Sequence, residues 1–201
     1  MNPTLPSPTE LEVRCRALAL LDAVMCADWD DRHHSFDASW APGMRMASMR
    51  DGSGDHWFIL FLDGSGCGLV GLAHESEAFR ARAVDPSSVP EPLVEHFVQE
   101  PAFDTKHCSF MAWRLEAQAS WTWLRSGKPD GADELMNLLV GPALRYAEFA
   151  QDYFELDEAP PIDRIESVFR GIPPTERDAN ALNPHVEWTA IREELRAIAA
   201  T

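Results

Sequence analysis

Apolar residues recur along residues 8–27 at the spacing of one face of a helix. Leu11, Leu18, Leu21 and Met25 share one side, and smaller apolar residues beside them widen the stripe. The serine, proline and glutamate at the start of this segment match a capping box with proline in the first helical position. The pattern therefore predicts a first helix that packs against a sheet or against other helices.

From residue 35 the pattern changes to short apolar runs separated by clusters of Gly, Asp and Ser, which is typical of an antiparallel meander. The expected strands lie at residues 35–40, 45–50, 56–62, 67–73, 108–115 and 119–124. The fully apolar run WFILFL within 56–62 predicts a central strand that is covered on both faces.

The proline-rich segment 75–92 is expected to cross the surface, with a short helix near 91–99. The last third of the chain reads as helical. Its expected helices lie at residues 132–140, 143–155, 162–170, 175–182 and 185–199. Thr175 with Asp178 forms a second capping box, and Asn183 before a proline predicts the start of the last helix.

This order of elements predicts an α+β fold. We expect a single α+β domain over residues 1–201, with an N-terminal helix in 1–27, an antiparallel sheet of about five strands in 35–124, and a helical half in 132–201. A hydrophobic content of 45%, with seven Trp and ten Phe, indicates a packed globule.

No stretch approaches the length of a membrane span, and the first residues lack a signal-peptide pattern. The four cysteines form no CxxC pair, which favours reduced thiols. These features predict a cytoplasmic location.

The charge is strongly acidic: 17 basic residues face 33 acidic ones, for a net charge of −16. This charge argues against nucleic acid and anionic membranes as partners, because both require a basic surface. It favours a basic protein partner, although a surplus of acid can also serve solubility alone. The acids are concentrated in residues 51–100, with nine acids against two bases, and in 151–201, with eleven against five.

The stretch MASMRDGSGDHWFILF holds a Gly-rich loop with two aspartates between two apolar runs. Its Asp-x-Ser-x-Asp spacing resembles the start of a calcium loop, but His56 and Leu62 stand where the EF-hand pattern needs Gly and Glu. A phosphate loop requires a following helix and a nearby lysine, and neither is present. A tight turn between two strands is the favoured interpretation.

Two histidine motifs suggest chemistry only weakly. His74 and Glu75 match the first half of the HExxH zinc motif, but Ala78 occupies the place of the second histidine. His107 and Cys108 are adjacent, and that arrangement is unusual for a thiol nucleophile and its base. No catalytic or metal-ligating residue is assigned, and no cofactor is expected.

Aromatic residues offer a second class of candidate. The tryptophans of segments 108–115 and 119–124 could stack a base or a sugar, but the acidic charge favours a place in the core. Trp29 and Trp40 lie among polar neighbours and are expected to be partly exposed. Such tryptophans are typical anchors of protein interfaces.

One set of motifs carries a resemblance. The chain has HSF at 34–36, Trp40, MASMRDGSG at 46–54, Gly71 and HES at 74–76, with EPAF and LNP further on. In this pattern it resembles a family of bacterial cytoplasmic proteins of unknown activity with a MASMRxGSG…HES signature, except that His34 replaces an aromatic residue. Small, acidic, tryptophan-rich α+β proteins of this kind are similar, at class level, to immunity proteins that neutralise bacterial toxins.

We therefore expect a cytoplasmic protein-binding module, and specifically an immunity protein that binds a basic toxin domain. The sequence favours binding over catalysis but leaves an enzyme open. The sequence leaves the oligomeric state open. The expected partner-binding residues are Trp29, Trp40, Glu75, Glu77, Asp85, Glu91, Glu95, Asp152, Glu155, Asp157 and Glu158.

Two alternatives stay open. One is a small metal-assisted hydrolase built on His33, His34 and His74 with nearby carboxylates, for example Asp30 or Asp31. The other is a structural subunit of a larger assembly.

Overall fold

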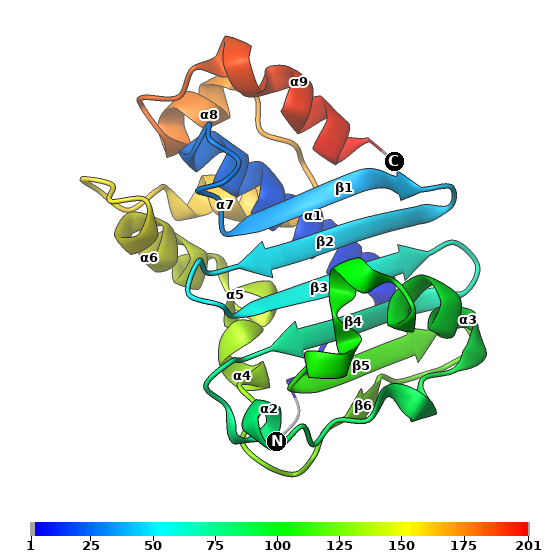
Figure 1. Cartoon of the computed structure of the whole chain (residues 1–201). Helices are drawn as coiled ribbons and strands as arrows, with labels where there is room; N and C mark the ends of the chain where they lie inside the picture. Colours follow the sequence, from blue (N-terminus) through cyan, green and yellow to red (C-terminus); the bar gives the residue numbers. More distant parts are fainter. Residues whose placement is uncertain (1–2, 201) are drawn as a thin grey trace.

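A computed structural model of the chain describes residues 3–200 (Figure 1). Its centre is one antiparallel sheet of six strands, whose order in space equals their order in the chain. The strands are β1 His34–Ala41, β2 Met44–Arg50, β3 His56–Leu62, β4 Gly66–Leu72, β5 Phe110–Leu115 and β6 Thr122–Leu124. The predicted α+β fold is confirmed. The sheet has six strands where about five were expected, and each strand overlaps one of the expected ranges.

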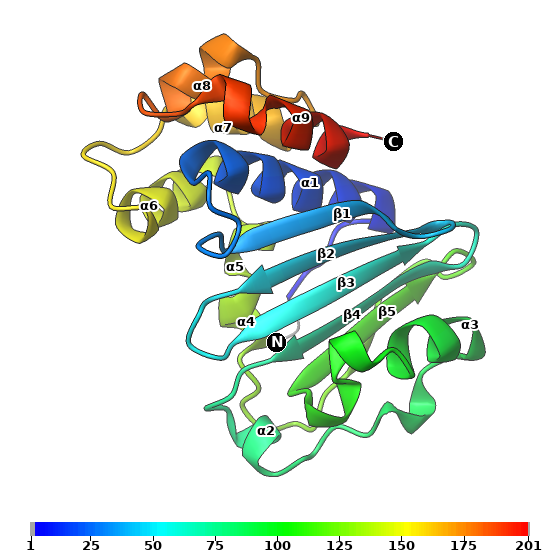
Figure 2. The same cartoon turned by 45° about the horizontal axis from the view of Figure 1, so that its top comes forward.

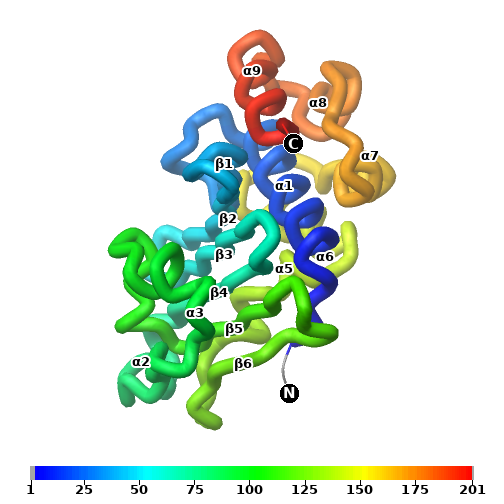
Figure 3. Tube along the Cα trace, turned by 90° about the vertical axis from the view of Figure 1, so that its right-hand side faces the viewer, coloured from blue at the N-terminus to red at the C-terminus, as the bar shows by residue number. Residues whose placement is uncertain are grey.

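One face of the sheet carries α1 and the C-terminal helices, as the side view in Figure 3 shows. These elements are α1 Pro8–Met25, α4 Ala132–Leu135, α5 Asn137–Val140, α6 Ala143–Tyr153, α7 Ile162–Phe169, α8 Glu176–Leu182 and α9 Trp188–Ala199. Helix α1 contacts the sheet on one side and α7, α8 and α9 on the other, and all of its residues from 17 to 25 are buried. The sequence predicted an apolar stripe, and the helix is in fact apolar on nearly all sides, as its central position requires.

The opposite face is covered by the segment between β4 and β5, which we call the cover segment (residues 77–107; Figure 2). Its short helical turns are α2 Glu77–Arg80, η1 Pro86–Ser88, α3 Glu91–Leu93, η2 Val94–Val98, η3 Pro101–Phe103 and η4 Thr105–His107. The sequence predicted that this segment crosses the surface, but the segment also contributes to the core. Five of its apolar side chains are buried against the sheet, namely Val84, Val89, Leu93, Phe97 and Phe103.

Strand β3 shows why the sheet needs a cover on both sides. Its residues alternate between the two faces, so that Trp57 and Ile59 enter the core under α1 whereas Phe58 and Leu60 enter the core under the cover segment. All of its residues from position 57 onward are buried, which confirms the prediction of a central strand covered on both faces.

The predicted capping boxes of α1 and α8 are both present, with Ser7 and Thr175 as the capping residues. The predicted start of the last helix is wrong. Asn183 does not begin α9, which starts five residues later. Its side-chain amide instead donates to the carbonyl oxygens of Val24 and Met25 at 3.0 and 3.1 Å, and so satisfies the end of α1.

The two outer strands of the sheet are irregular. The register of β1 against β2 shifts between Asp37 and Ala41, and β6 is only three residues long. Within residues 3–200, no helix combines the length and the apolar character that a membrane crossing requires.

Candidate functional site

The loops at one end of the sheet bring together most of the polar groups that the sequence singles out. The hairpin loop between β2 and β3, the exit of β4 and the exit of β6 all lie at this end (Figure 1). In the hairpin loop, the Asp51 carboxylate accepts hydrogen bonds from the backbone N–H groups of Ser53, Gly54 and Asp55 at 2.8 to 3.1 Å. This pattern confirms a tight turn, because the carboxylate is occupied by its own loop.

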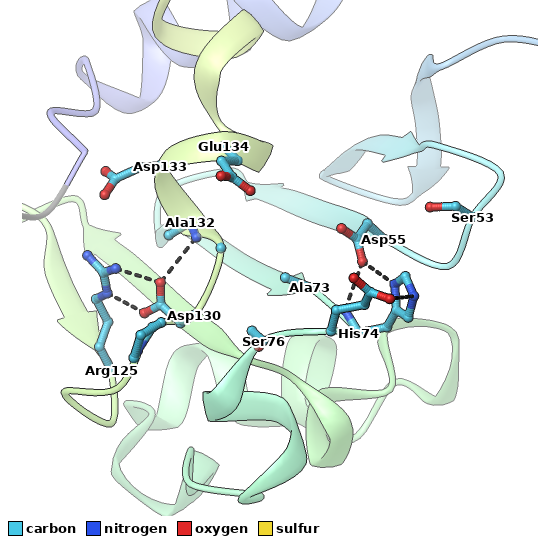
Figure 4. A pocket seen from close by; sticks show the side chains of 13 residues that line it. Ser53, Asp55, Ala73, His74, Ser76, Arg125, Asp130, Ala132, Asp133 and Glu134 are labelled. Atoms are coloured by element: carbon cyan, nitrogen blue, oxygen red, sulfur yellow. Dashed lines mark hydrogen bonds and ion pairs between the residues drawn. The ribbon is translucent and has the colours of Figure 1, made fainter.

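A pocket of about 660 Å³ opens beside this hairpin (Figure 4), and we call it the acidic pocket. Its ionisable lining consists of five carboxylates with one histidine and one arginine: Asp55, Glu75, Asp130, Asp133, Glu134, His74 and Arg125. The electrostatic potential inside the acidic pocket is therefore negative, and this favours the binding of a cationic group.

His74 and Asp55 form one wall of the acidic pocket. The Asp55 carboxylate lies 2.6 Å from Nδ1 of His74 and accepts the backbone N–H of His74 at 2.8 Å. This hydrogen bond raises the pKa of the His74 imidazole, and the negative charge of Asp55 raises it further. The pairing joins the start of β3 to the exit of β4, and it fixes the ring beside the opening.

Arg125 and Asp130 form the opposite wall. Asp130 is almost fully buried, and it accepts hydrogen bonds from the Arg125 guanidinium and from the backbone N–H of Ala132. Asp133 and Glu134 follow on α4 and are exposed. The buried ion pair thus holds the loop after β6 in a shape that presents two further carboxylates at the pocket.

A second acidic pocket of about 620 Å³ lies between the end of α6 and the end of α8. Glu155, Asp157 and Glu158 line it together with His185. The loop after α6 lies at the same end of the sheet as the β2–β3 hairpin and α2 in both Figure 1 and Figure 2. We call this end the acidic edge, and its exposed or half-buried acids include Asp51, Asp55, Glu75, Glu77, Asp133, Glu134, Asp152, Glu155, Asp157 and Glu158.

The partner-binding residues expected from the sequence lie at two different ends of the sheet. Glu75 and Glu77 lie at the acidic edge with the four acids of residues 152–158, whereas Glu91 and Glu95 belong to α3 and η2. Helix α3 lies at the other end of the sheet (Figures 1 and 2). Asp85 is exposed in the connection between these ends. The stretch 75–100 is therefore not one continuous acidic surface.

The two expected aromatic anchors also differ. Trp29 is 49% exposed and lies 5.5 Å from the Arg50 guanidinium. Trp40 is only half-buried, but it stacks on Phe103 at 5.9 Å and packs against the core under the cover segment. Trp29 is consequently the better placed of the two for a partner.

Sequence reasoning missed four of the five carboxylates of the acidic pocket, namely Asp55, Asp130, Asp133 and Glu134. The DGADE run after the last predicted strand was a signal for three of them. Asp55 was interpreted only as part of a turn.

Two of the three histidines of the alternative hydrolase, His33 and His34, line one pocket of about 240 Å³ together with Asp30. His34 is buried, and its Nδ1 lies 3.0 Å from the buried Asp22, which also accepts the hydroxyl of Tyr146 at 2.7 Å. His74 belongs to the acidic pocket instead. Across residues 3–200 no three His, Cys, Asp or Glu side chains are grouped as metal ligands would be.

His33 and Cys108 are held in their neutral forms. Burial lowers the pKa of His33 to about 4, and the neighbouring His34 acts in the same direction. Burial raises the pKa of the Cys108 thiol to about 12, and His107 pairs with Asp104. Cys108 therefore lacks the thiolate character of a nucleophile.

Comparison of the chain with protein-family models, with curated proteins and with solved structures found no match.

Proposed function

We propose that this chain is a binding module for a basic protein, which docks on the acidic edge. The observation that carries the proposal is the gathering of carboxylates around two pockets at one end of the sheet, on an already acidic chain. The type of protein that best combines these features is a cytoplasmic immunity protein that neutralises a bacterial toxin by direct binding.

Electrostatics supports a protein partner of this kind. A surface with several carboxylates attracts a basic partner over about one Debye length and raises the association rate. The acidic pocket, at about 660 Å³, has room for lysine or arginine side chains of that partner. Trp29, at the same end of the molecule, supplies an exposed aromatic surface that would slow dissociation.

The test is co-expression with the product of the neighbouring gene, followed by measurement of association and dissociation rates of the purified pair. We expect the association rate to fall at least about tenfold when salt is raised from about 50 to about 300 mM, because screening weakens the steering. The double variant Asp133→Lys with Glu134→Lys should slow association by a further factor of about 10 to 100.

The matched control reverses two charges at the other end of the sheet, in Glu91→Lys with Glu95→Lys. Both double variants change the net charge by the same amount, so only the position of the change differs. Equal effects of the two variants, or a complex that is insensitive to salt, would contradict docking on the acidic edge.

A further inference from the structure

A third pocket is lined mainly by histidines and aromatic rings rather than by acids, and we call it the histidine pocket. It measures about 240 Å³ and lies between the start of β1, the end of β2 and the end of α6. Its ring-bearing lining residues are Trp29, His33, His34 and Tyr153. Asp30 is the one acid among the described residues that line it.

His34 is held in one orientation by a buried carboxylate. Asp22, on α1, is fully buried and accepts the backbone N–H of His34 at 2.6 Å and the hydroxyl of Tyr146 at 2.7 Å. The same carboxylate lies 3.0 Å from Nδ1 of the His34 ring. Because a carboxylate acts as the acceptor in these contacts, Nδ1 carries the proton of the neutral ring, and Nε2 is left with a free lone pair.

That lone pair is open to the histidine pocket. His34 is only 3% exposed, and its Nε2 atom makes no hydrogen bond within residues 3–200. In that part of the chain, the side-chain nitrogen and oxygen atoms that are both unpaired and sealed from water are Nη1 of Arg14 and Nδ1 of His33. Nε2 of His34 is not one of them, so a water-sized molecule can reach it, and the cavity that His34 lines is the histidine pocket.

The other walls of the histidine pocket suit a flat ring. Trp29 and Tyr153 are 49% and 37% exposed, and the His33 ring lies 5.3 Å from the Tyr153 ring in an edge-on arrangement. The cavity is smaller than the roughly 300 to 1,000 Å³ of pockets for drug-sized ligands, so it has room for about one ring.

We propose that the histidine pocket binds a phenol group, whose hydroxyl donates to Nε2 of His34 and whose ring packs against Trp29 and Tyr153. A phenol is a stronger donor than an aliphatic alcohol because its O–H is more acidic. The hydrogen bond from Nδ1 to Asp22 makes Nε2 a better acceptor in turn. Aromatic side chains also hold a ring in preferred edge-on or offset geometries.

Two sources carry this group: a free small phenol, or the tyrosine side chain of another protein. The inference does not depend on the proposed function, because it is tested on the full chain alone, without a protein partner.

Titration of the full chain with phenol, followed by NMR, tests the proposal. We expect phenol to bind at least about tenfold more tightly than fluorobenzene, which has a similar size but no donor. The ¹⁵N resonance of His34 Nε2 should shift with phenol and stay in place with fluorobenzene. A second arm compares N-acetyltyrosinamide with N-acetylphenylalaninamide. Tighter binding of the tyrosine compound than of phenol points to a tyrosine side chain, and the reverse points to a free phenol.

Two variants locate the site. His34→Phe keeps a ring but removes the acceptor, so it should abolish the preference for phenol over fluorobenzene. Trp29→Ala changes an exposed side chain and should weaken phenol binding by about threefold to tenfold. The control Ile172→Ala removes a similarly exposed apolar side chain, 53% exposed, in the loop after α7, and should leave binding unchanged.

A thermal scan shows whether each variant folds. If His34→Phe does not fold, the Nε2 resonance of the wild type and the Trp29→Ala variant decide the question. Equal binding of phenol and fluorobenzene, an Nε2 resonance that ignores phenol, equal effects of Trp29→Ala and Ile172→Ala, or no binding of phenol and of the tyrosine compound would overturn the proposal.

Discussion

Acidification should unfold this protein partly through one residue, His33. Its ring packs against Phe149 and Tyr153 at centroid distances of 4.8 and 5.3 Å, and its Nδ1 atom is buried without a hydrogen-bond partner among residues 3–200. Burial therefore favours the neutral ring, with a pKa of about 4 against an ordinary value of 6.5. The unfolded chain binds the proton more readily, so protonation between these two values favours unfolding.

The magnitude follows from the gap between the two pKa values. Each pKa unit corresponds to about 1.4 kcal/mol. The free energy of unfolding of the wild type should therefore fall, relative to neutral pH, by about 2 kcal/mol at about pH 5 and by about 3 kcal/mol at about pH 4 because of His33. The loss is absent above about pH 7. The variant His33→Phe keeps a ring of similar size and cannot take up the proton, so it should lack this part of the acid sensitivity.

The assay is urea unfolding of the wild type and the variant at about pH 7, 5 and 4. The carboxylates titrate in both proteins, so the difference between the two stability curves isolates His33. The control His185→Gln removes an exposed histidine and should follow the wild type. Parallel curves for the wild type and His33→Phe would refute the reasoning.

Three further outcomes are expected. Gly71→Ala would place a Cβ atom 2.0 Å from the Phe110 ring. Urea unfolding should therefore show a free energy of unfolding that is lower by about 3 kcal/mol or more, unless the variant fails to fold at all. Asp55→Asn removes the partner that raises the pKa of His74, so the His74 titration followed by NMR should move to lower pH. Asn183→Ala leaves the last carbonyls of α1 without their donor, and thermal or urea unfolding should show a loss of about 1 to 3 kcal/mol. A loss below about 0.5 kcal/mol would show that water replaces this amide without penalty.

The sequence predicted those parts of the fold that depend on local pattern. The capping residues Ser7 and Thr175 fix helix starts because their side chains bond to backbone groups only three residues away. The strand 56–62 could be predicted to its ends because its uninterrupted apolar run is bounded by two Gly-rich turns.

Long-range pairing could not be predicted in the same way. The side chain of Asn183 serves a helix end more than 150 residues earlier, and no local pattern shows such a partner. The buried Asp22 left a weak signal, as a lone acid within the most apolar part of α1, but its partners His34 and Tyr146 are set by the packing of β1 and α6. The same limit applies to the acidic pocket, since its walls come from three separated loops.

The irregular outer strands of the sheet affect how other molecules can approach. A chain that adds itself to a sheet needs a long, flat row of unpaired amide and carbonyl groups. The bulged β1 and the three-residue β6 provide no such row. Strand exchange and fibril growth by backbone pairing are thereby disfavoured, and recognition is left to side chains.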